Sequence, residues 1–295
     1  MSKMITLANG VEMPRVGMGV FQMTPEQAEN ATKWALEAGY RSIDTAQGYN
    51  NEEAVGRGLI ASGLAREEVF ITTKVRASQL GYDATKTAFY ESLEKLQLDY
   101  IDLFLIHWPK TGLYNDAWRA MEELYEAGKI KAIGVSNFLP EHLDQLLTTA
   151  KIVPMINQIE VHPMLNQAEA RKYNDSLGIV TEAYSPLGSG HLLRHPALLE
   201  LAEKYGKTTA QLMIRWEIQN DIVTIPKSVN KDRITANFDA WDFNISAEDI
   251  EIINGLNENK RVGTDPLHFM EIFYGDMAQP EYVLSDWEKD LENKR

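Results

Sequence analysis

The sequence predicts a single α/β domain folded as a (β/α)8 barrel, and two observations support this prediction. Eight short apolar runs recur at intervals of 24 to 42 residues, with helical stretches between them. Several runs are almost continuously apolar, as strands are when both faces of a parallel sheet are covered. Eight strand–helix units in about 240 residues fit a closed barrel better than an open doubly wound sheet, which is the alternative on spacing alone. The runs begin near Val16, Arg41, Val69, Tyr100, Ile130, Pro154, Val180 and Ile222.

A β-hairpin is expected before the barrel. Residues 5–7 and 11–13 flank Asn9-Gly10, a pair typical of a two-residue type I′ turn. We expect the hairpin over about residues 5–13, the barrel over about 16–258, and a C-terminal loop and tail over about 259–295 that lies over the mouth. No linker rich in Ser, Gly or Pro interrupts the chain, so residues 1–295 are expected to form one domain.

Local signals predict where the helices begin and end. Thr24-Pro25-Glu26-Gln27 supplies an N-cap, a proline in the first turn and a capping-box glutamine. Helix ends are expected at Gly39, Gly128 and Gly178. Later helices are expected over residues 197–205, 208–220 and 246–256. Residues 271–295 hold seven acids and three bases, which predicts a mobile, solvated segment.

Composition narrows the functional classes. The chain has 29 Lys and Arg against 43 Asp and Glu, a net charge of −14 and a pI near 4.9. Such a field repels a polyanion, so no nucleic-acid partner is expected. The absence of cysteine excludes disulfides, thiolate nucleophiles and zinc–thiolate sites. Neither a signal-type apolar region nor an uncharged apolar run of about 18 residues occurs, which predicts a cytoplasmic protein without a membrane segment.

Polar residues at the ends of the apolar runs indicate the chemistry. In a (β/α)8 barrel the carboxyl ends of the strands meet at one mouth, where catalytic groups lie. Asp44, Lys74 and His107 end three runs, and Tyr49 lies in a loop after one of them. Tyrosine titrates near pH 10; a nearby ammonium favours the phenolate and lowers that pKa, and an aspartate holds the ammonium in place. With His107 orienting a substrate oxygen, these residues predict a general acid for a carbonyl, and a cofactor must carry any redox step.

Seven motifs carry a resemblance to a known family. They are, in chain order, Asp44-Thr45-Ala46-x-x-Tyr49, Phe70-Ile71-Thr72-Thr73-Lys74, the run from Asp102 to Pro109, Gly134-Val135-Ser136-Asn137-Phe138, Asn157-Gln158, Tyr184-Ser185-Pro186-Leu187-Gly188 and Ile225-Pro226-Lys227-Ser228. In these motifs and their order, from about residue 5 to residue 266, the chain resembles the aldo-keto reductase family. Its short loops are most similar to the microbial branch with 2,5-diketogluconate reductases and prostaglandin F synthases.

The resemblance implies a reaction and a set of site residues. The reaction is hydride transfer from NADPH to an aldehyde or ketone, with Tyr49 as proton donor, Lys74 and Asp44 tuning it, and His107 orienting the substrate. The implied contacts of NADPH or NADP+ are Ser136, Asn137 and Gln158 at the nicotinamide carboxamide, Tyr184 on its ring, Ser185, Leu187 and Ser189 along the pyrophosphate, Lys227, Ser228 and Arg233 at the 2′-phosphate, and Asn237 at the adenine. The implied substrate-binding residues are Phe21, Tyr49, His107 and Trp108.

Other functions fit the residues less well. A barrel glycosidase needs two carboxylates across the mouth, for which Asp44 and Glu160 are candidates. A catalytically weak, NADPH-binding regulatory protein of the same fold is a second alternative, and the complete set of four polar residues argues against it. No metal site is expected, because His191 and His195 lie in a predicted loop.

The substrate is expected to be a small-molecule carbonyl, and the protein a monomer. Residues 110–117 form a loop of eight residues that cannot wall the mouth alone. The C-terminal residues 266–274 are therefore expected to help, and an open rim favours small polar carbonyls. The alternative is that the tail aromatics only pack on the outside of the barrel. These aromatics are Phe269, Phe273, Tyr274 and Trp287.

Overall fold

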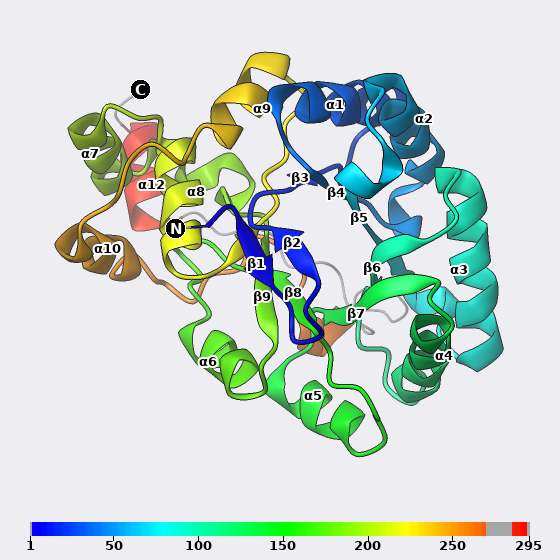
Figure 1. The fold of residues 1–295 in the computed structure, drawn as a ribbon. Coiled ribbons are helices and arrows are strands. Elements are labelled where there is room, and N and C mark those ends of the chain that lie inside the picture. The colour runs from blue at the N-terminus through cyan, green and yellow to red at the C-terminus, as the bar shows by residue number, and fades with distance from the viewer. Residues whose placement is uncertain (1, 270–284, 294–295) are drawn as a thin grey trace.

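Eight parallel strands curl into a barrel with the helices outside it in this computed structural model, which describes residues 2–269 and 285–293 (Figure 1). A parallel bridge between Val16 and Thr224 joins the two edges of this eight-stranded sheet. Backbone hydrogen bonds from Gly17 N to Thr224 O and from Thr224 N to Arg15 O, both 2.9 Å, extend this seam. The predicted (β/α)8 barrel is therefore confirmed, and the open sheet is wrong. The strands are β1 (Met4–Thr6), β2 (Glu12–Pro14), β3 (Met18–Gly19), β4 (Ser42–Asp44), β5 (Phe70–Val75), β6 (Ile101–Ile106), β7 (Ile130–Ser136), β8 (Ile156–Glu160), β9 (Val180–Tyr184) and β10 (Val223–Thr224).

The helices begin and end close to the predicted signals. Thr24 Oγ1 accepts from Gln27 N, and the Gln27 side chain accepts from Thr24 N, so the predicted capping box is present. Gly39, Gly128 and Gly178 all have positive φ just after a helix, as predicted. The helices are α1 (Pro25–Ala38), α2 (Glu52–Ser62), α3 (Tyr82–Leu96), α4 (Tyr114–Glu126), α5 (Pro140–Leu147), α6 (Ala168–Ser176), α7 (Pro196–Tyr205), α8 (Thr209–Gln219), α9 (Lys231–Phe238), α10 (Ala247–Asn254) and α12 (Asp286–Asn293).

The hairpin β1–β2 lies across one end of the barrel (Figure 1), but its turn differs from the prediction. Gly10 has a φ of 86°, whereas Asn9 has no positive φ, so the turn is not type I′. Leu7 N bonds to Val11 O, which leaves a three-residue loop. The Asn9 side chain accepts from Val11 N and donates to Lys131 O, 2.9 Å away on β7. These contacts hold Asn9 in the longer loop.

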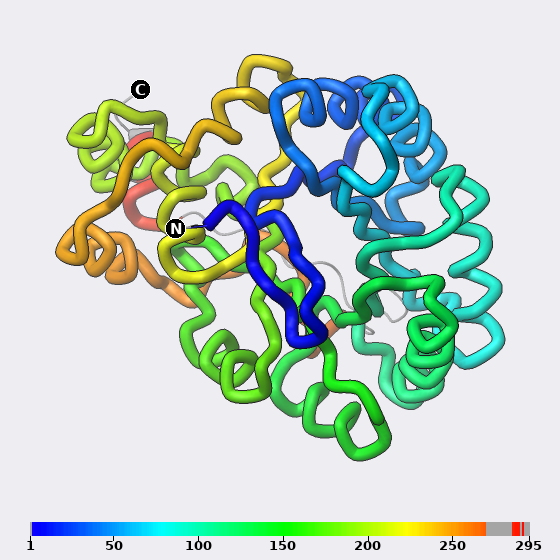
Figure 2. The backbone as a smooth tube through the Cα atoms, viewed as in Figure 1, coloured from blue at the N-terminus to red at the C-terminus, as the bar shows by residue number. Residues whose placement is uncertain are grey.

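Part of the tail is a helix packed on the barrel rather than a solvated segment. Trp287 of α12 lies against His195, with ring centroids 4.7 Å apart, and packs on a buried cluster that includes Leu198 and Leu201 of α7. The backbone of α12, red in Figure 2, lies beside that of α7. Glu288 is buried and accepts from Lys260 Nζ (3.2 Å) and Ser285 N (2.7 Å). The expectation of a mobile segment is wrong for residues 285–293, because an aromatic side chain and a paired carboxylate attach them. Residues 270–284, 294 and 295 lie outside the described part of the chain.

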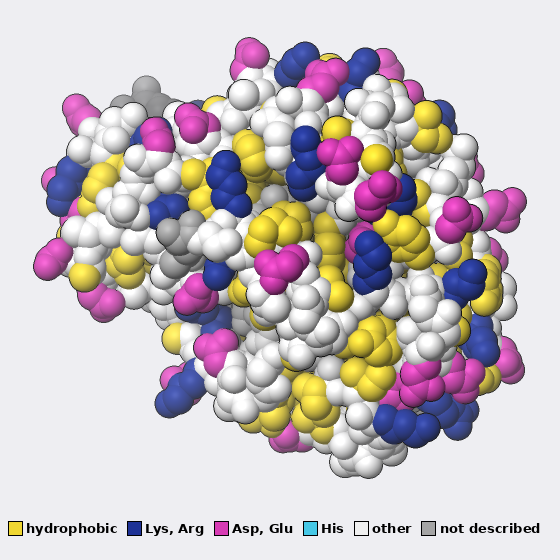
Figure 3. Space-filling view, viewed as in Figure 1, with side chains coloured by type: hydrophobic (Ala, Val, Ile, Leu, Met, Phe, Trp, Pro, Cys, Tyr) yellow, Lys and Arg dark blue, Asp and Glu magenta, His cyan; other side chains and the backbone are white. Residues whose placement is uncertain are grey.

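Acidic and basic side chains intermingle on the face of the molecule shown in Figure 3. In the described ranges, no helix combines the length and apolar character needed to cross a bilayer.

Candidate active site

A buried lysine joins three groups at the mouth of the barrel. Lys74 of β5 has no exposed surface. Its Nζ donates to Asp44 Oδ1 at 2.6 Å, to Thr45 O at 2.9 Å and to the Tyr49 hydroxyl at 3.3 Å. Asp44 ends β4, and Tyr49 ends the short 3-10 turn η1 (Gln47–Tyr49) that follows. The structure therefore brings together the three residues that the sequence predicted to act as one acid.

The pKa values of this group follow from burial and charge. Burial opposes the charge of Lys74, but Asp44 and then Tyr49 outweigh it and raise the pKa of the lysine. For Tyr49, burial raises the pKa, and Lys74 lowers it by a smaller amount. The expectation of a lowered tyrosine pKa is therefore wrong in direction, because desolvation exceeds the effect of the nearby ammonium. Tyr49 is thus protonated at neutral pH, which is the form that a proton donor needs.

Buried hydrogen bonds hold the turn that carries Tyr49. Thr45 Oγ1 donates to Asn51 Oδ1 at 2.8 Å, and Asn51 Nδ2 donates to Val20 O at 2.9 Å. Arg76, the residue after β5, donates from NH2 to Gln47 O at 2.8 Å. Asn51 and Gln47 were missed by sequence reasoning. Their closeness to Tyr49 in the chain was the only available signal.

His107 follows β6 and faces Tyr49. The two rings have centroids 5.5 Å apart in an edge-to-face arrangement. Burial, and then the charge of Lys74, lower the pKa of His107 well below its ordinary value. The imidazole is therefore neutral and carries one N–H donor, which suits a group that orients a polar oxygen.

The four predicted nicotinamide-binding residues lie side by side. Ser136 pairs in register with Gln158 on β8. Asn137 has a φ of 64° and donates from Nδ2 to His107 O at 3.0 Å. Tyr184 donates from its hydroxyl to Asn137 Oδ1 at 2.8 Å. Asn137 therefore links the Tyr184 hydroxyl to the backbone of His107.

Glu182 lies beside this set and was not identified from the sequence. It is fully buried on β9, in register with Gln158. Gln158 Nε2 donates to Glu182 Oε2 and to Asp44 Oδ2, both at 2.8 Å. Burial and then the charge of Asp44 raise the pKa of Glu182 to about 8. Its position two residues before Tyr184, on the same side of a strand, was the signal that could have found it.

The predicted pyrophosphate residues share one loop after β9. Ser185, Gly188, Ser189 and Gly190 all have positive φ, between 49° and 91°. Leu187, within this loop, is half-buried against the core. The structure therefore joins Ser185, Leu187 and Ser189 in one strongly turned segment.

The residues predicted to bind the 2′-phosphate and the adenine lie in the segment after β10 and in α9. Lys227 and Arg233 are exposed, and neither makes an ion pair with a residue that the structure describes. Asn230 caps α9 by accepting from Arg233 N at 3.0 Å. Ser228 and Asn237 are buried. Two unpaired cations at a helix N-terminus fit a bound phosphate group.

Aromatic rings form the rim of the mouth. Phe21 is 52% exposed, and its ring centroid lies 5.0 Å from that of Tyr49. Trp108 and Phe269 stack with centroids 4.3 Å apart and an interplanar angle of 4°. Phe269 thus reaches the mouth, as predicted for the C-terminal segment, whereas Trp287 packs outside the barrel. Phe273 and Tyr274 lie outside the described residues.

The Glu160 carboxylate holds the C-terminal segment at the end of β8. It accepts from Val262 N at 2.6 Å and Gly263 N at 3.1 Å, and it contacts His162 Nε2 at 2.9 Å. Because Asp44 is likewise paired with Lys74, neither carboxylate is free to act on a glycosidic bond. The glycosidase alternative is therefore not favoured.

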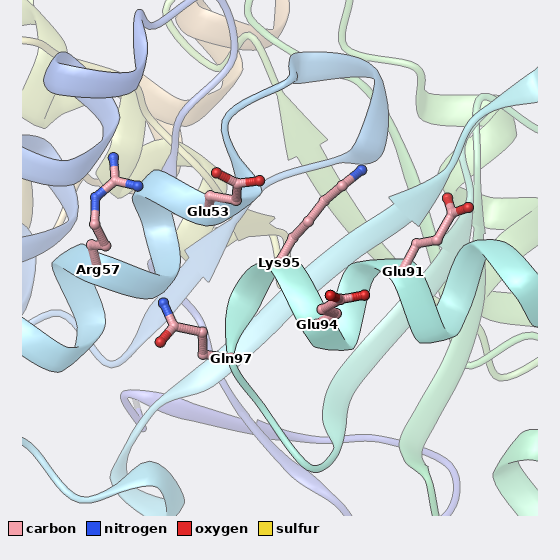
Figure 4. A pocket seen from close by; sticks show the side chains of 6 residues that line it. All are labelled: Glu53, Arg57, Glu91, Glu94, Lys95 and Gln97. Carbon is pink, nitrogen blue, oxygen red and sulfur yellow. The ribbon is translucent and has the colours of Figure 1, made fainter.

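A groove of about 400 Å³ on the outside of the barrel is separate from this site. It lies between α2 and α3 (Figure 4). Its lining residues are Glu53, Arg57, Glu91, Glu94, Lys95 and Gln97. It shares no residue with the mouth.

Comparison with known proteins gives a consistent result. The model of the aldo/keto reductase family matches residues 15–258. A glyoxal reductase from Bacillus subtilis is 52% identical over 263 residues, which cover 89% of this chain and 95% of the relative. A 9,11-endoperoxide prostaglandin H2 reductase from Trypanosoma cruzi is 50% identical over 269 residues, which cover 90% of this chain and 95% of the relative.

Solved structures agree with this match. An aldo-keto reductase from Bombyx mori in complex with NADP superposes with a TM-score of 0.85 at 38% identity, covering 90% of this chain and 96% of that one. A point mutant of Gox0644 in complex with NADPH gives a TM-score of 0.86 at 40% identity, covering 90% of this chain and 97% of that one.

Glu182→Gln is expected to gain stability relative to the wild type as the pH rises. The pKa of Glu182 is about 8 in the folded chain against 4.5 as its ordinary value. Between these values the folded wild type retains a proton that the unfolded chain has lost, so its stability falls by up to about 1.4 kcal/mol per pH unit. Glutamine has no such proton. The measurement is the free energy of unfolding between about pH 5 and pH 9.

The exposed Glu53→Gln is the matched control, and a constant difference between Glu182→Gln and wild type would contradict the prediction.

Proposed function

The chain belongs to the aldo/keto reductase family, and on this premise we propose which of its residues perform the reaction. The protein is an NADP-dependent oxidoreductase that reduces carbonyl groups. The proposal assigns the proton transfer to Tyr49, Lys74, Asp44 and His107. The observation that carries it is the Lys74 ammonium, which touches both the Tyr49 hydroxyl and the Asp44 carboxylate.

Tyr49 acts as the general acid. The raised pKa of its hydroxyl keeps the proton in place until a substrate oxygen gains negative charge. Lys74 Nζ, 3.3 Å away, then stabilises the phenolate that the transfer leaves behind. Asp44 keeps the lysine charged and prevents it from turning away. His107, held neutral, donates a hydrogen bond that aligns the carbonyl oxygen with the Tyr49 hydroxyl.

The residues present fit a dinucleotide phosphate cofactor. Lys227 and Arg233 form no ion pair with a residue that the structure describes, so both charges can bind a phosphate. Gln158 Oε1 accepts no hydrogen bond from the described residues. When bound, NADPH supplies the hydride. We assign it the residues predicted from the sequence: Ser136, Asn137, Gln158, Tyr184, Ser185, Leu187, Ser189, Lys227, Ser228, Arg233 and Asn237.

The proposed substrates are small aldehydes and dicarbonyls. The Bacillus subtilis relative is named a glyoxal reductase, and the rim built from Phe21, Trp108 and Phe269 leaves Phe21 half-exposed. The test is oxidation of NADPH, followed by its absorbance, with glyoxal, methylglyoxal and a nitrobenzaldehyde. The branch within the family, the single domain over residues 1–295, the monomeric state and the cytoplasmic location stay predictions from the sequence.

Tyr49→Phe is expected to lower kcat by roughly 10²- to 10⁴-fold, because the proton donor is lost. NADPH binding, measured by quenching of tryptophan fluorescence, should persist. The matched control is Tyr90→Phe, which removes a hydroxyl from an exposed tyrosine on α3 and should leave kcat unchanged. Substantial activity in Tyr49→Phe would overturn the assigned role.

Arg233→Ala is expected to raise the KM for NADPH by about tenfold or more, since a charged hydrogen bond is worth roughly 1.5–3 kcal/mol. The KM for NADH, which lacks the 2′-phosphate, should change little. Lys231→Ala is the control: Lys231 lies on the same helix but pairs with Glu37 at 3.3 Å. Equal effects of Arg233→Ala on both cofactors would mean that the phosphate binds elsewhere.

Phe269→Ala is expected to raise the KM for a nitrobenzaldehyde by about 2- to 10-fold, the equivalent of one aromatic contact. The KM for glyoxal should change less, because so small a substrate makes little contact with the Trp108–Phe269 wall. The Kd for NADPH should stay constant. Leu267→Ala, at an exposed neighbouring position, is the control. A loss of NADPH affinity would instead assign this segment to the cofactor site.

A further inference from the structure

We propose that Glu182 is a positioning residue that, together with Asp44, fixes the side-chain amide of Gln158 so that only the carbonyl oxygen of Gln158 is offered to the cofactor. This inference rests on the proposed function, in which Gln158 binds the nicotinamide carboxamide. It deepens that proposal by giving Glu182, which has no role in the proton transfer, a role in recognising the cofactor.

The geometry around Gln158 determines the orientation of its amide. Gln158 Nε2 has two hydrogens, and it lies 2.8 Å from Asp44 Oδ2 and 2.8 Å from Glu182 Oε2. Both hydrogens are therefore used. A rotation of the amide by 180° would set Gln158 Oε1 against the Asp44 carboxylate, acceptor facing acceptor. That arrangement loses the hydrogen bond to Asp44 whether or not Glu182 is protonated, so the observed orientation is the stable one.

The register of the sheet makes this arrangement possible. Gln158 pairs with Glu182 across β8 and β9, so their side chains leave the sheet on the same side. Ser136 pairs with Gln158 across β7 and β8, and its Oγ donates to Gln158 O at 2.9 Å. The backbone and the side chain of Gln158 are thus held by separate contacts.

Packing alone does not explain Glu182, because burying its carboxyl group costs free energy of folding. It has no exposed surface, and its Oε1 has no hydrogen-bond partner in the described part of the protein. Its Oε2 contacts Gln158 there. Burying a carboxyl group without full hydrogen bonding costs free energy that an apolar strand residue would not. Whether protonated or ionised, Glu182 presents an acceptor oxygen to Gln158.

This orientation predicts which cofactor group Gln158 recognises. An amide oxygen accepts a hydrogen bond from an N–H donor, so Gln158 Oε1 suits the NH2 of the nicotinamide carboxamide. A cofactor analogue with an acetyl group in place of the carboxamide has no such donor. The contribution of Glu182 should therefore appear with NADP+ and vanish with the 3-acetylpyridine analogue.

The experiment measures the Kd of both ligands by quenching of tryptophan fluorescence in wild type, E182M and E182Q. For E182M, which has no acceptor at this position, we expect the Kd of NADP+ to rise about 2- to 10-fold, the effect of one hydrogen bond, and that of the acetylpyridine analogue to stay within about twofold. E182Q keeps an acceptor oxygen, so it should bind both ligands within about twofold of wild type. If E182M does not fold by circular dichroism, E182V takes its place with the same expectation.

Each other outcome overturns the inference. An equal rise for both ligands in E182M would show a general structural role, and no rise would show no role in positioning. A rise in E182Q as large as in E182M would mean that charge, not an acceptor, matters. Q158M separates this inference from the proposed function. If Q158M leaves NADP+ binding unchanged, the assignment of Gln158 fails; if it weakens NADP+ and E182M does not, only the role of Glu182 fails.

Discussion

The buried ion pair between Lys74 and Asp44 is the interaction on which the rest of the site depends. A lysine with no exposed surface is tolerable only when a carboxylate neutralises it and its remaining hydrogens are bonded. Asp44 Oδ1 and Thr45 O meet that requirement, and the third hydrogen points at the Tyr49 hydroxyl. The contacts that make the burial of Lys74 possible therefore also place its charge beside Tyr49, the proposed acid.

The second oxygen of Asp44 extends this network toward the residues that we propose for the cofactor. Asp44 Oδ2 accepts from Gln158 Nε2, which also donates to Glu182. The carboxyl groups of Asp44 and Glu182 therefore bind the same amide, and the Lys74 ammonium is the cation near both of them. One buried cation neutralises only one carboxylate, and this is why burial and Asp44 raise the pKa of Glu182 to about 8. The proposed acid and the amide of Gln158 thus belong to one hydrogen-bonded network that passes through Lys74 and Asp44.

The outer boundary of the site is built differently, from backbone amides and aromatic rings. Glu160, at the end of β8, accepts from the amides of Val262 and Gly263 and so brings the C-terminal segment back to the mouth. A few residues later Phe269 stacks on Trp108. The residues proposed for proton transfer lie at strand ends and in a hydrogen-bonded turn, whereas the proposed substrate rim includes this returning segment.

The sequence by itself determined the barrel and its strands, and it named the residues that we propose for the acid. Periodic apolar runs record burial on both faces of each strand, and local signals such as Thr24 and Gly39 depend on only a few neighbouring residues. Only the tertiary structure decided the turn at Asn9, the helix around Trp287, the direction of the Tyr49 pKa and the contact between Glu182 and Gln158. Each of these depends on groups far apart in the chain: Asn9 on Lys131, Trp287 on His195, and Glu182 on Gln158 and Asp44. Distance, burial and competing charges arise only when the chain is folded, and no local pattern records them.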